Sequence, residues 1–309
     1  MARKRAQIAV FELVLFLLAS GARAESGRIE INQAIALAGG VNGSTVADPP
    51  GFPVLITQPG SYVLTSDLSN PANDLHAIQI EAADASIDLG GFAITGGAGE
   101  TGCSGFGLAI GIVGTRENAT VRNGTIRKMR VAGIDLSGET ARVEDVRVED
   151  NCGAGVQVGS GALVARVTAL RNGAAGIDCY AWCRLADASA WSNGASAGGL
   201  QVDLFSVVSE SVAADNAATG LRGYEGEVVV HSIAARNQGD GILIFRTGNA
   251  IGNVVQRNTR YGISGSNAVG LGAFTSNFQG EYEGVAHACN AFTGGFVDCP
   301  SPPPAPAKP

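Results

Sequence analysis

The chain has 309 residues, 44 of them glycine, and only 16% of its residues are charged, which suits a turn-rich fold with one buried core. Its formal net charge is −7 at pH 7, and no basic patch follows residue 24, which argues against a nucleic-acid partner. One repeat array and no linker are visible, so we expect a single domain.

Residues 1–24 have the three parts of a secretory signal peptide. A basic start at residues 3–5 precedes an apolar stretch at residues 8–19, and small residues at 22 and 24 form the cleavage pattern. A membrane anchor is the alternative, but the apolar stretch is short and Glu12 interrupts it. We therefore expect a secreted or periplasmic protein that has no membrane segment after cleavage.

Residues 25–60 are expected to form an N-terminal cap and lead-in strands. Within them the sequence IEINQAIALA, residues 29–38, has apolar residues at helical spacing and ends at Gly39-Gly40. This pattern predicts a short amphipathic helix. A stacked fold needs such a cap, because its terminal unit leaves unpaired strand edges and an uncovered core.

Residues 61–298 repeat one phrase, a glycine followed by a branched aliphatic residue, every 21 to 23 residues from Gly133 onwards. Self-similarity at this period predicts stacked units that bury a core only together. Short runs of alternating apolar residues, without helical spacing, predict three strands per unit and therefore an all-β parallel β-helix. The phrase begins at Gly133, Gly155, Gly176, Gly199, Gly220, Gly241, Gly262 and Gly284.

Fixed spacing should align like residues in files along the stack. An asparagine precedes most of these glycines, and we expect the asparagines to form a structural ladder at one corner. Asparagine tolerates the left-handed conformation of a tight corner, and the following glycine should let the chain leave it. Small apolar residues three positions before each asparagine predict an interior file, and polar residues directly before it predict a solvated file. The ladder comprises Asn151, Asn172, Asn193, Asn216, Asn237 and Asn258.

Six cysteines, an even number, fit an oxidising compartment. A zinc site is the rival interpretation of the pair with three residues between its cysteines, although no second pair or nearby histidine stands at ligand spacing. Spacing predicts two local disulfides and leaves one pair over, namely Cys179–Cys183, Cys289–Cys299 and Cys103–Cys152. Beyond them, residues 299–309 form a proline-rich tail that we expect to be extended and disordered.

The coils RNGAAGIDC, DNAATGLRG, RNQGDGILI and RNTRYGISG resemble the right-handed parallel β-helix proteins of the pectin-lyase-like superfamily, in particular its secreted bacterial members. The resemblance covers residues from about 29 to 298, and it implies a right-handed solenoid. It also implies a role at polysaccharides, but the superfamily includes lyases, hydrolases, epimerases and non-catalytic proteins on one scaffold. The Asp-Pro-His phrase of alginate-epimerase-like sites is absent here, and no complete catalytic motif is found.

The coil from residue 176 to 199 is the longest and least regular, and insertions on solenoids commonly form the binding face. Asp178 and Arg184 on this coil, with Asp145 and Arg171 on neighbouring coils, are our catalytic candidates.

Aromatic residues on the same and the following coil are candidates for ligand binding. They could form an exposed strip on which sugar rings stack, and packing beneath the coil is the alternative interpretation. These residues are Tyr180, Trp182, Trp191 and Tyr224.

No cofactor is expected, and no metal site is complete. Calcium takes several oxygen ligands, and the nearest approach to such a set is an acidic cluster at Glu144, Asp145, Glu149 and Asp150. The three histidines, including His76, share no phrase and are expected to be solvated.

Two hypotheses for the function follow from these observations. The first is an exported β-helix protein that binds a polysaccharide along a lateral groove and, if it is an enzyme, acts as a lyase or hydrolase. The alternative is a non-catalytic surface or adhesin-like rod.

Overall fold

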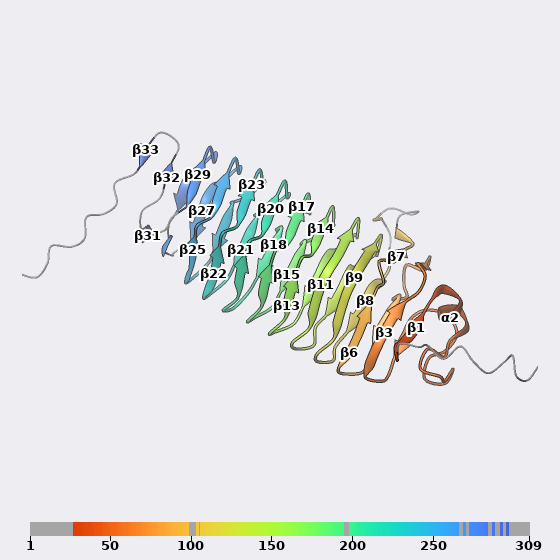
Figure 1. Ribbon diagram of the computed structural model, residues 1–309. Coiled ribbons are helices and arrows are strands. Elements are labelled where there is room, and N and C mark those ends of the chain that lie inside the picture. The colour runs from red at the N-terminus through yellow and green to blue at the C-terminus, as the bar shows by residue number, and fades with distance from the viewer. Residues whose placement is uncertain are drawn as a thin grey trace, which may run out of the picture.

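The computed structural model describes residues 27–98, 103–104, 106–194 and 198–265, and then 268–269, 272–283, 286–287, 291–292 and 295–296. Within these residues the chain is a parallel β-solenoid whose coils stack along one axis (Figure 1). The predicted parallel β-helix is confirmed. The predicted signal peptide, the proline-rich tail and the predicted Cys289–Cys299 pair lie outside the described residues.

One face of the solenoid is a parallel sheet with 11 strands among the described residues, which we call the 11-stranded sheet. Between residues 110 and 265 its strands contain or directly follow the glycine of the repeated phrase, and the repeat brings Ile134, Val156 and Ile177 into register on adjacent coils. The strands are β2 (Val54–Ile56), β5 (Ile78–Ile80), β8 (Ile110–Gly114), β10 (Ala132–Leu136), β12 (Ala154–Val158), β15 (Ile177–Cys179), β18 (Leu200–Val202), β21 (Leu221–Gly223), β24 (Ile242–Ile244), β27 (Tyr261–Gly265) and β30 (Gly280–Glu283).

The remaining strands form two further runs, and the long strands β9 (Thr120–Arg127) and β11 (Arg142–Glu149) belong to both. The first run contains β1 (Ile29–Ile31), β3 (Gly60–Leu64), β6 (Ala85–Asp88), β13 (Leu163–Ala165), β16 (Arg184–Ala186), β19 (Val207–Ser209), β22 (Glu227–Val230), β25 (Gly248–Ile251), β28 (Ala268–Val269) and β31 (Ala286–His287). The second run contains β4 (Leu68–Asn70), β7 (Ala93–Gly96), β14 (Thr168–Leu170), β17 (Ser189–Trp191), β20 (Val212–Ala214), β23 (Ile233–Ala235), β26 (Val254–Gln256), β29 (Ala273–Thr275), β32 (Ala291–Phe292) and, antiparallel to β32, β33 (Gly295–Phe296).

A short helix, α2 (Gln33–Ala38), lies at the N-terminal end of the stack (Figure 1). The Asn32 side chain caps it by accepting a hydrogen bond of 2.9 Å from the Ile35 amide. The predicted cap helix is therefore confirmed, but its predicted start at residue 29 is wrong. Residues 29–31 instead form β1 and pair with β3, because the first coil offers them an open strand edge.

The asparagine ladder is confirmed, and it continues to Asn277, which sequence analysis missed. Asn172 represents the pattern. Its amide nitrogen donates to the Asn193 side-chain oxygen at 3.0 Å and to the Val148 carbonyl at 3.2 Å. Its own oxygen accepts from the Asn151 side chain at 2.9 Å. The ladder thus satisfies buried amides and backbone groups of three coils at once.

The expected left-handed corner at the asparagines is wrong, because the residue before each asparagine adopts that conformation. This placement turns the chain one residue early and lets the asparagine side chain enter the interior. The φ angles are 55° at Asp150, 52° at Arg171, 54° at Ser192, 56° at Asp215, 54° at Arg236 and 56° at Arg257.

The expected role of the glycines at the corner is also wrong. Gly155 has no positive φ. A glycine is needed there because neighbouring atoms leave no room for a Cβ. A Cβ there would lie 2.4 Å from the Gly176 carbonyl oxygen and 2.9 Å from the Asn172 amide nitrogen. The glycine file therefore exists because the ladder and the next coil approach too closely for any side chain.

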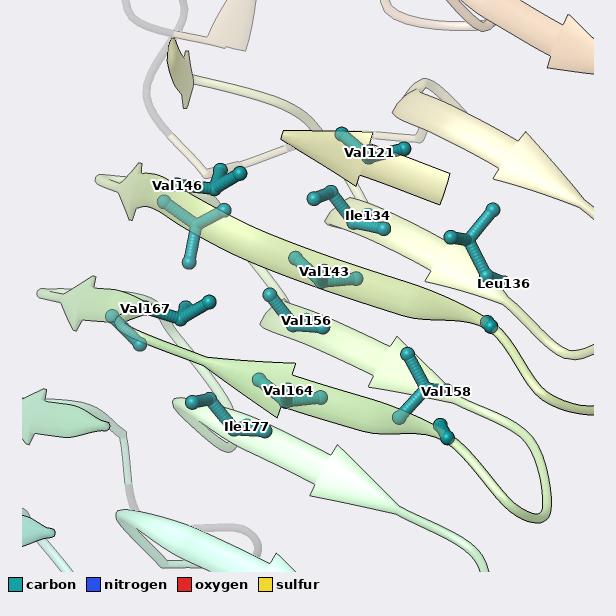
Figure 2. Packing of buried hydrophobic residues seen from close by; sticks show 14 of the residues in the cluster. Val121, Ile134, Leu136, Val143, Val146, Val156, Val158, Val164, Val167 and Ile177 are labelled. Atoms are coloured by element: carbon teal, nitrogen blue, oxygen red, sulfur yellow. The ribbon is translucent and has the colours of Figure 1, made fainter. Parts of the chain in front are cut away.

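The interior is a narrow apolar core. Branched side chains of the 11-stranded sheet and of the facing strands point toward one another, as Ile134, Val143, Val156 and Val164 do (Figure 2). The predicted interior file is confirmed, since all its members are fully buried. They are Val148, Ala169, Ala190, Ala213, Ala234 and Val255.

The predicted solvated file is confirmed as well. Arg171 pairs with Asp150 on the coil before it, and Arg236 pairs with Asp215, with nitrogen–oxygen distances of 2.7 Å and 2.6 Å. Each exposed pair stabilises the fold by only about 0–1 kcal/mol. The main source of stability is therefore the core and the ladder.

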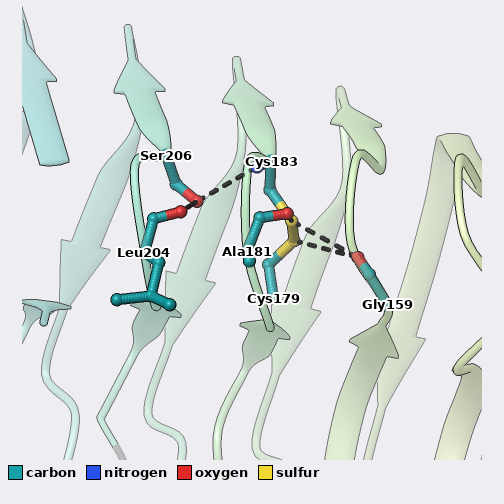
Figure 3. The surroundings of a disulfide bond; sticks show 6 residues. All are labelled: Gly159, Cys179, Ala181, Cys183, Leu204 and Ser206. Atoms are coloured by element: carbon teal, nitrogen blue, oxygen red, sulfur yellow. Dashed lines mark hydrogen bonds between the residues drawn. A yellow bond between two sulfur atoms is a disulfide. The ribbon is translucent and has the colours of Figure 1, made fainter. Parts of the chain in front are cut away.

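Two of the predicted disulfides are present, Cys103–Cys152 and Cys179–Cys183. The second closes the bend between β15 and β16, and its sulfurs lie 3.9 Å and 3.5 Å from the Gly159 carbonyl oxygen of the preceding coil (Figure 3). The Ser206 hydroxyl accepts a hydrogen bond of 3.0 Å from the Cys183 amide. Because these sulfurs are bonded to each other, the zinc interpretation is wrong.

Candidate functional site

Polar side chains form a file along the outer face of the 11-stranded sheet. They stand two positions after the repeated glycines, and strand alternation turns them away from the core. The strand register places each beside the next, so they follow one another up the solenoid. We call this the polar file, and it consists of Asp135, Gln157, Asp178, Gln201 and Arg222.

A second file runs beside the polar file, two residues further along each strand. The Tyr180 amide donates to the Val158 carbonyl, and the Asp203 amide donates to the Cys179 carbonyl, which fixes their place on adjacent coils. Tyr180 and Tyr224 are 63% and 41% exposed, so aromatic surface is open to solvent here.

A groove follows these two files. Its centre is a depression of about 440 Å³ lined by Asp135, Gln157, Asp178, Tyr180 and Asp203, among others. A second depression of about 220 Å³ shares Tyr180 and Asp203 and continues to Tyr224. We call the two together the sheet groove, and it extends across several coils rather than closing around a compact ligand.

Two carboxyls of the sheet groove, those of Asp178 and Asp203, have pKa values shifted toward the protonated form. Burial, reinforced by the negative charge of Asp203, raises the pKa of Asp178, although a hydrogen bond from Gln157 and the charge of Arg222 oppose this. Burial likewise raises the pKa of Asp203, against the opposing charge of Arg222. A carboxyl that retains its proton at higher pH is suited to donate it.

A histidine that sequence analysis expected to be solvated lies close to this file. His76 is partly buried, and its Nδ1 accepts a hydrogen bond of 3.1 Å from the Ile110 amide. Burial lowers the pKa of His76, while Asp135 opposes that shift. Burial also raises the pKa of Asp135, opposed by His76. His76 lines a neighbouring depression of about 500 Å³, which extends the polar face toward the N-terminal coils.

A buried carboxylate, Glu227, supports the turn that carries Tyr224. Glu227 is fully buried at the start of β22, and its Oε1 accepts a hydrogen bond of 2.6 Å from the Glu225 amide. Burial raises the pKa of Glu227, whereas backbone hydrogen bonds, including one from the Tyr224 amide, lower it. Sequence analysis missed this residue, because a polar residue at the start of a predicted strand is expected to be exposed to solvent.

The structure brings together three of the predicted site residues and separates the others. Asp178, Tyr180 and Tyr224 line the sheet groove. Trp182 stands at the corner beyond Tyr180, with a φ of 50°. The remaining candidates on this coil, Arg184 on β16 and Trp191 on β17, belong to the other two strand runs.

The acidic cluster on β11 lies on the other strand runs too, and its carboxylates face arginines. Asp145 pairs with Arg166, and Asp150 pairs with Arg171, each at 2.7 Å. Among the described residues, no three histidine, cysteine or acidic side chains converge in a way that could hold a metal ion.

Comparisons with known proteins support the fold. No family model matches the sequence, and no curated protein sequence matches it. The solved structure of the periplasmic alginate epimerase AlgG is similar over 85% of this chain and 83% of its own, with a TM-score of 0.54 at 11% identity. A mutant of that epimerase is similar over 87% of this chain and 74% of its own, with a TM-score of 0.51 at 13% identity. Identities this low establish a shared fold and not a shared chemistry.

The raised pKa of Asp178 predicts how Asp178→Asn changes stability with pH. A carboxyl with a higher pKa in the folded state binds more protons when folded, so its ionisation destabilises the fold as pH rises. We expect the variant to be more stable than the wild type at pH 7, and the difference to vanish below the ordinary aspartate pKa of about 4. Urea titrations at pH 4 and pH 7 measure this. Equal stabilities at pH 7 would contradict the expected burial of the Asp178 charge.

Proposed function

We propose that this protein binds a polysaccharide along the sheet groove. The observation that carries the proposal is the in-register polar file beside the exposed Tyr180 and Tyr224, which repeats hydrogen-bonding groups at the spacing of the coils. A polymer that repeats its own hydroxyl groups matches a surface of this kind. The similarity in fold to an alginate epimerase, an enzyme that acts on a polysaccharide, adds support.

The groove offers the contacts that a sugar chain needs. The apolar faces of sugar rings pack against aromatic side chains such as Tyr180 and Tyr224, and this buries surface from water. The side-chain amides of Gln157 and Gln201 both donate and accept hydrogen bonds, as sugar hydroxyls do. Polysaccharide binding is therefore assigned to the groove and not to the faces that carry Trp191 and Arg184.

The groove also contains groups that suit cleavage of a glycosidic bond. Asp178 is the proposed general acid in weakly acidic solution, because its raised pKa extends the pH range over which it holds the proton that the leaving oxygen would receive. Asp203 is the second carboxyl. Strand spacing and rise separate the two Cα atoms by about 8 Å, so the two carboxyls stand on adjacent coils of the same sheet face.

We further propose that the protein works outside the cytoplasm. Two disulfides are present, and such bonds persist mainly in oxidising compartments. The described part of the chain includes no helix that is long and apolar enough to cross a membrane.

The Tyr180→Ala and Tyr224→Ala variants test the groove assignment. We expect each to weaken binding of the best polysaccharide ligand by roughly ten- to a hundredfold, because each removes aromatic surface worth roughly 1.5–3 kcal/mol. Calorimetry against a panel of soluble glucans, mannans, xylans, pectins and alginates, with and without calcium, identifies that ligand. The matched control is Trp191→Ala, which removes an aromatic side chain of 40% exposure from another face and should leave binding unchanged.

Two results would count against the proposal in different ways. If no polymer binds, polysaccharide recognition fails and the rod-like structural role gains support. If Trp191→Ala weakens binding while both tyrosine variants bind normally, the ligand lies on another face. Chromatography of the polymer after incubation separates binding from cleavage, and Asp178→Asn should abolish shortened products without loss of the ligand.

A further inference from the structure

The centre of the sheet groove is acidic. Four carboxylates line the depression, from Asp135, Glu139, Asp178 and Asp203, and no lysine, arginine or histidine of the described residues lines it with them. These carboxylates stand on neighbouring coils, and those of Asp135, Asp178 and Asp203 are partly shielded from water. Together they produce a negative potential in the groove, which opposes the binding of any further negative charge. The groups between them are neutral amides and hydroxyls, such as those of Gln157 and Tyr180.

Two arginines stand at the C-terminal end of the groove, and each lies against an aromatic ring. The Arg222 guanidinium lies 5.0 Å from the centre of the Phe245 ring, and its charge acts on both Asp178 and Asp203. Arg246 lies 5.4 Å from the Tyr224 ring centre and pairs with Glu225 at 3.3 Å. Against the four carboxylates of the depression stand one arginine, Arg222, and His76, whose charge acts on Asp135, so the balance of charge is negative.

A uronate ring would bring its own carboxylate into this field. It would meet the carboxylates of Asp135, Asp178 and Asp203, which line the same depression. The negative charge of Asp203 already raises the pKa of Asp178, and a uronate carboxylate would add repulsion of the same kind. A metal ion could bridge the carboxylates of the sugar and the protein. However, no three acidic, histidine or cysteine side chains of the described residues converge for that purpose.

An uncharged sugar meets none of these obstacles. Its hydroxyls can donate to the carboxylates and exchange hydrogen bonds with the amides, and its apolar face can cover Tyr180 or Tyr224. Charged acceptors strengthen hydrogen bonds from hydroxyl donors, so the same carboxylates that repel uronates attract neutral sugars.

We infer that the sheet groove selects uncharged sugar rings and disfavours uronates, so that the ligand is a neutral glycan. This inference rests on the proposed function, since it specifies the ligand class of the same groove. It sets this chain apart from the alginate epimerases whose fold it shares, because alginate is a polymer of uronate rings.

The test uses ligands that differ only in charge. Oligomers of galacturonate and mannuronate are each compared with their carboxyl-reduced counterparts, which keep the ring and the linkage but carry no charge. We expect the reduced oligomer of a binding pair to bind about tenfold more tightly at 50 mM salt, and the ratio to shrink at 0.5 M salt because exposed charges are screened.

Variants then locate the source of the selectivity. The double variant Asp178→Asn with Asp203→Asn removes two charges from the groove without changing side-chain size, and it should bring the ratio close to one. The control double variant, Asp187→Asn with Asp215→Asn, removes two charges from corners outside the groove lining and should leave the ratio unchanged. Circular dichroism and the melting temperature confirm that each variant is folded.

The outcomes separate the inference from the proposed function. Tighter binding of the acidic oligomers overturns charge selection while leaving polysaccharide binding intact. Equal binding of the acidic and the reduced oligomer in every pair also overturns charge selection and leaves polysaccharide binding intact. Absence of binding by every charged and neutral glycan defeats both proposals. If the control variant changes the ratio as much as the groove variant, net charge and not the groove is responsible.

Discussion

Asn216→Ala is expected to destabilise the solenoid by about 4 kcal/mol. The Asn216 side chain makes four hydrogen bonds in the interior, two with Asn193 at 3.0 Å and 3.1 Å, one with the Ala190 carbonyl at 3.1 Å and one with Asn237 at 2.9 Å. Alanine would leave buried groups of the two adjacent coils without these partners, and each such group costs about 1–3 kcal/mol. Urea unfolding followed by circular dichroism measures the loss.

The neighbouring residue supplies the control. Asp215→Asn changes the adjacent side chain, keeps a residue that tolerates a left-handed backbone, and removes an exposed ion pair with Arg236. Its expected cost is below about 1 kcal/mol. If Asn216→Ala costs no more than this control, the ladder would be a consequence of coil stacking and not a support for it.

The stacking of coils could be predicted from the sequence because it depends on spacing. Each coil closes in nearly the same number of residues, so a residue such as Asn172 reappears at the same corner and its neighbours fall into files. The conformation of that corner could not be predicted in the same way. Asparagine is the usual left-handed residue, but here its side chain is needed inside, so Arg171 takes the strained φ instead.

The residues of the groove could likewise be predicted only in part. Asp178 and Tyr180 could be predicted because they stand on the irregular coil, and Tyr224 because it is aromatic and near them. The polar file was visible as the residue two positions after each glycine, yet its meaning depends on which sheet face stays open to solvent. The participation of His76 could not be predicted, since the contact with the Ile110 amide joins segments 34 residues apart in an irregular part of the chain.

Gly176→Ala is expected to destabilise the protein by about 3 kcal/mol and to disturb the sheet groove at the same time. An added Cβ would lie 2.7 Å from the Gly199 carbonyl oxygen, 2.8 Å from the Asn193 amide nitrogen and 3.0 Å from the Ala190 Cβ. Two of these neighbours are backbone or ladder atoms that cannot move without shifting the next coil. That coil carries Gln201, and β15 itself carries Asp178, so the variant should also bind the polysaccharide less tightly.

The matched control for this steric argument is Gly91→Ala. Gly91 has a φ of 82°, and a Cβ there would meet no atom within 4 Å, so the substitution introduces backbone strain without a clash. Strain of that kind costs about 1–2 kcal/mol. The difference between the two variants therefore measures the cost of the steric clash separately from the cost of backbone strain. Urea unfolding measures the stability of each variant, and calorimetry measures its binding. A Gly176→Ala variant as stable as Gly91→Ala would mean that adjacent coils can separate to admit a methyl group, and the glycine file would then need another explanation.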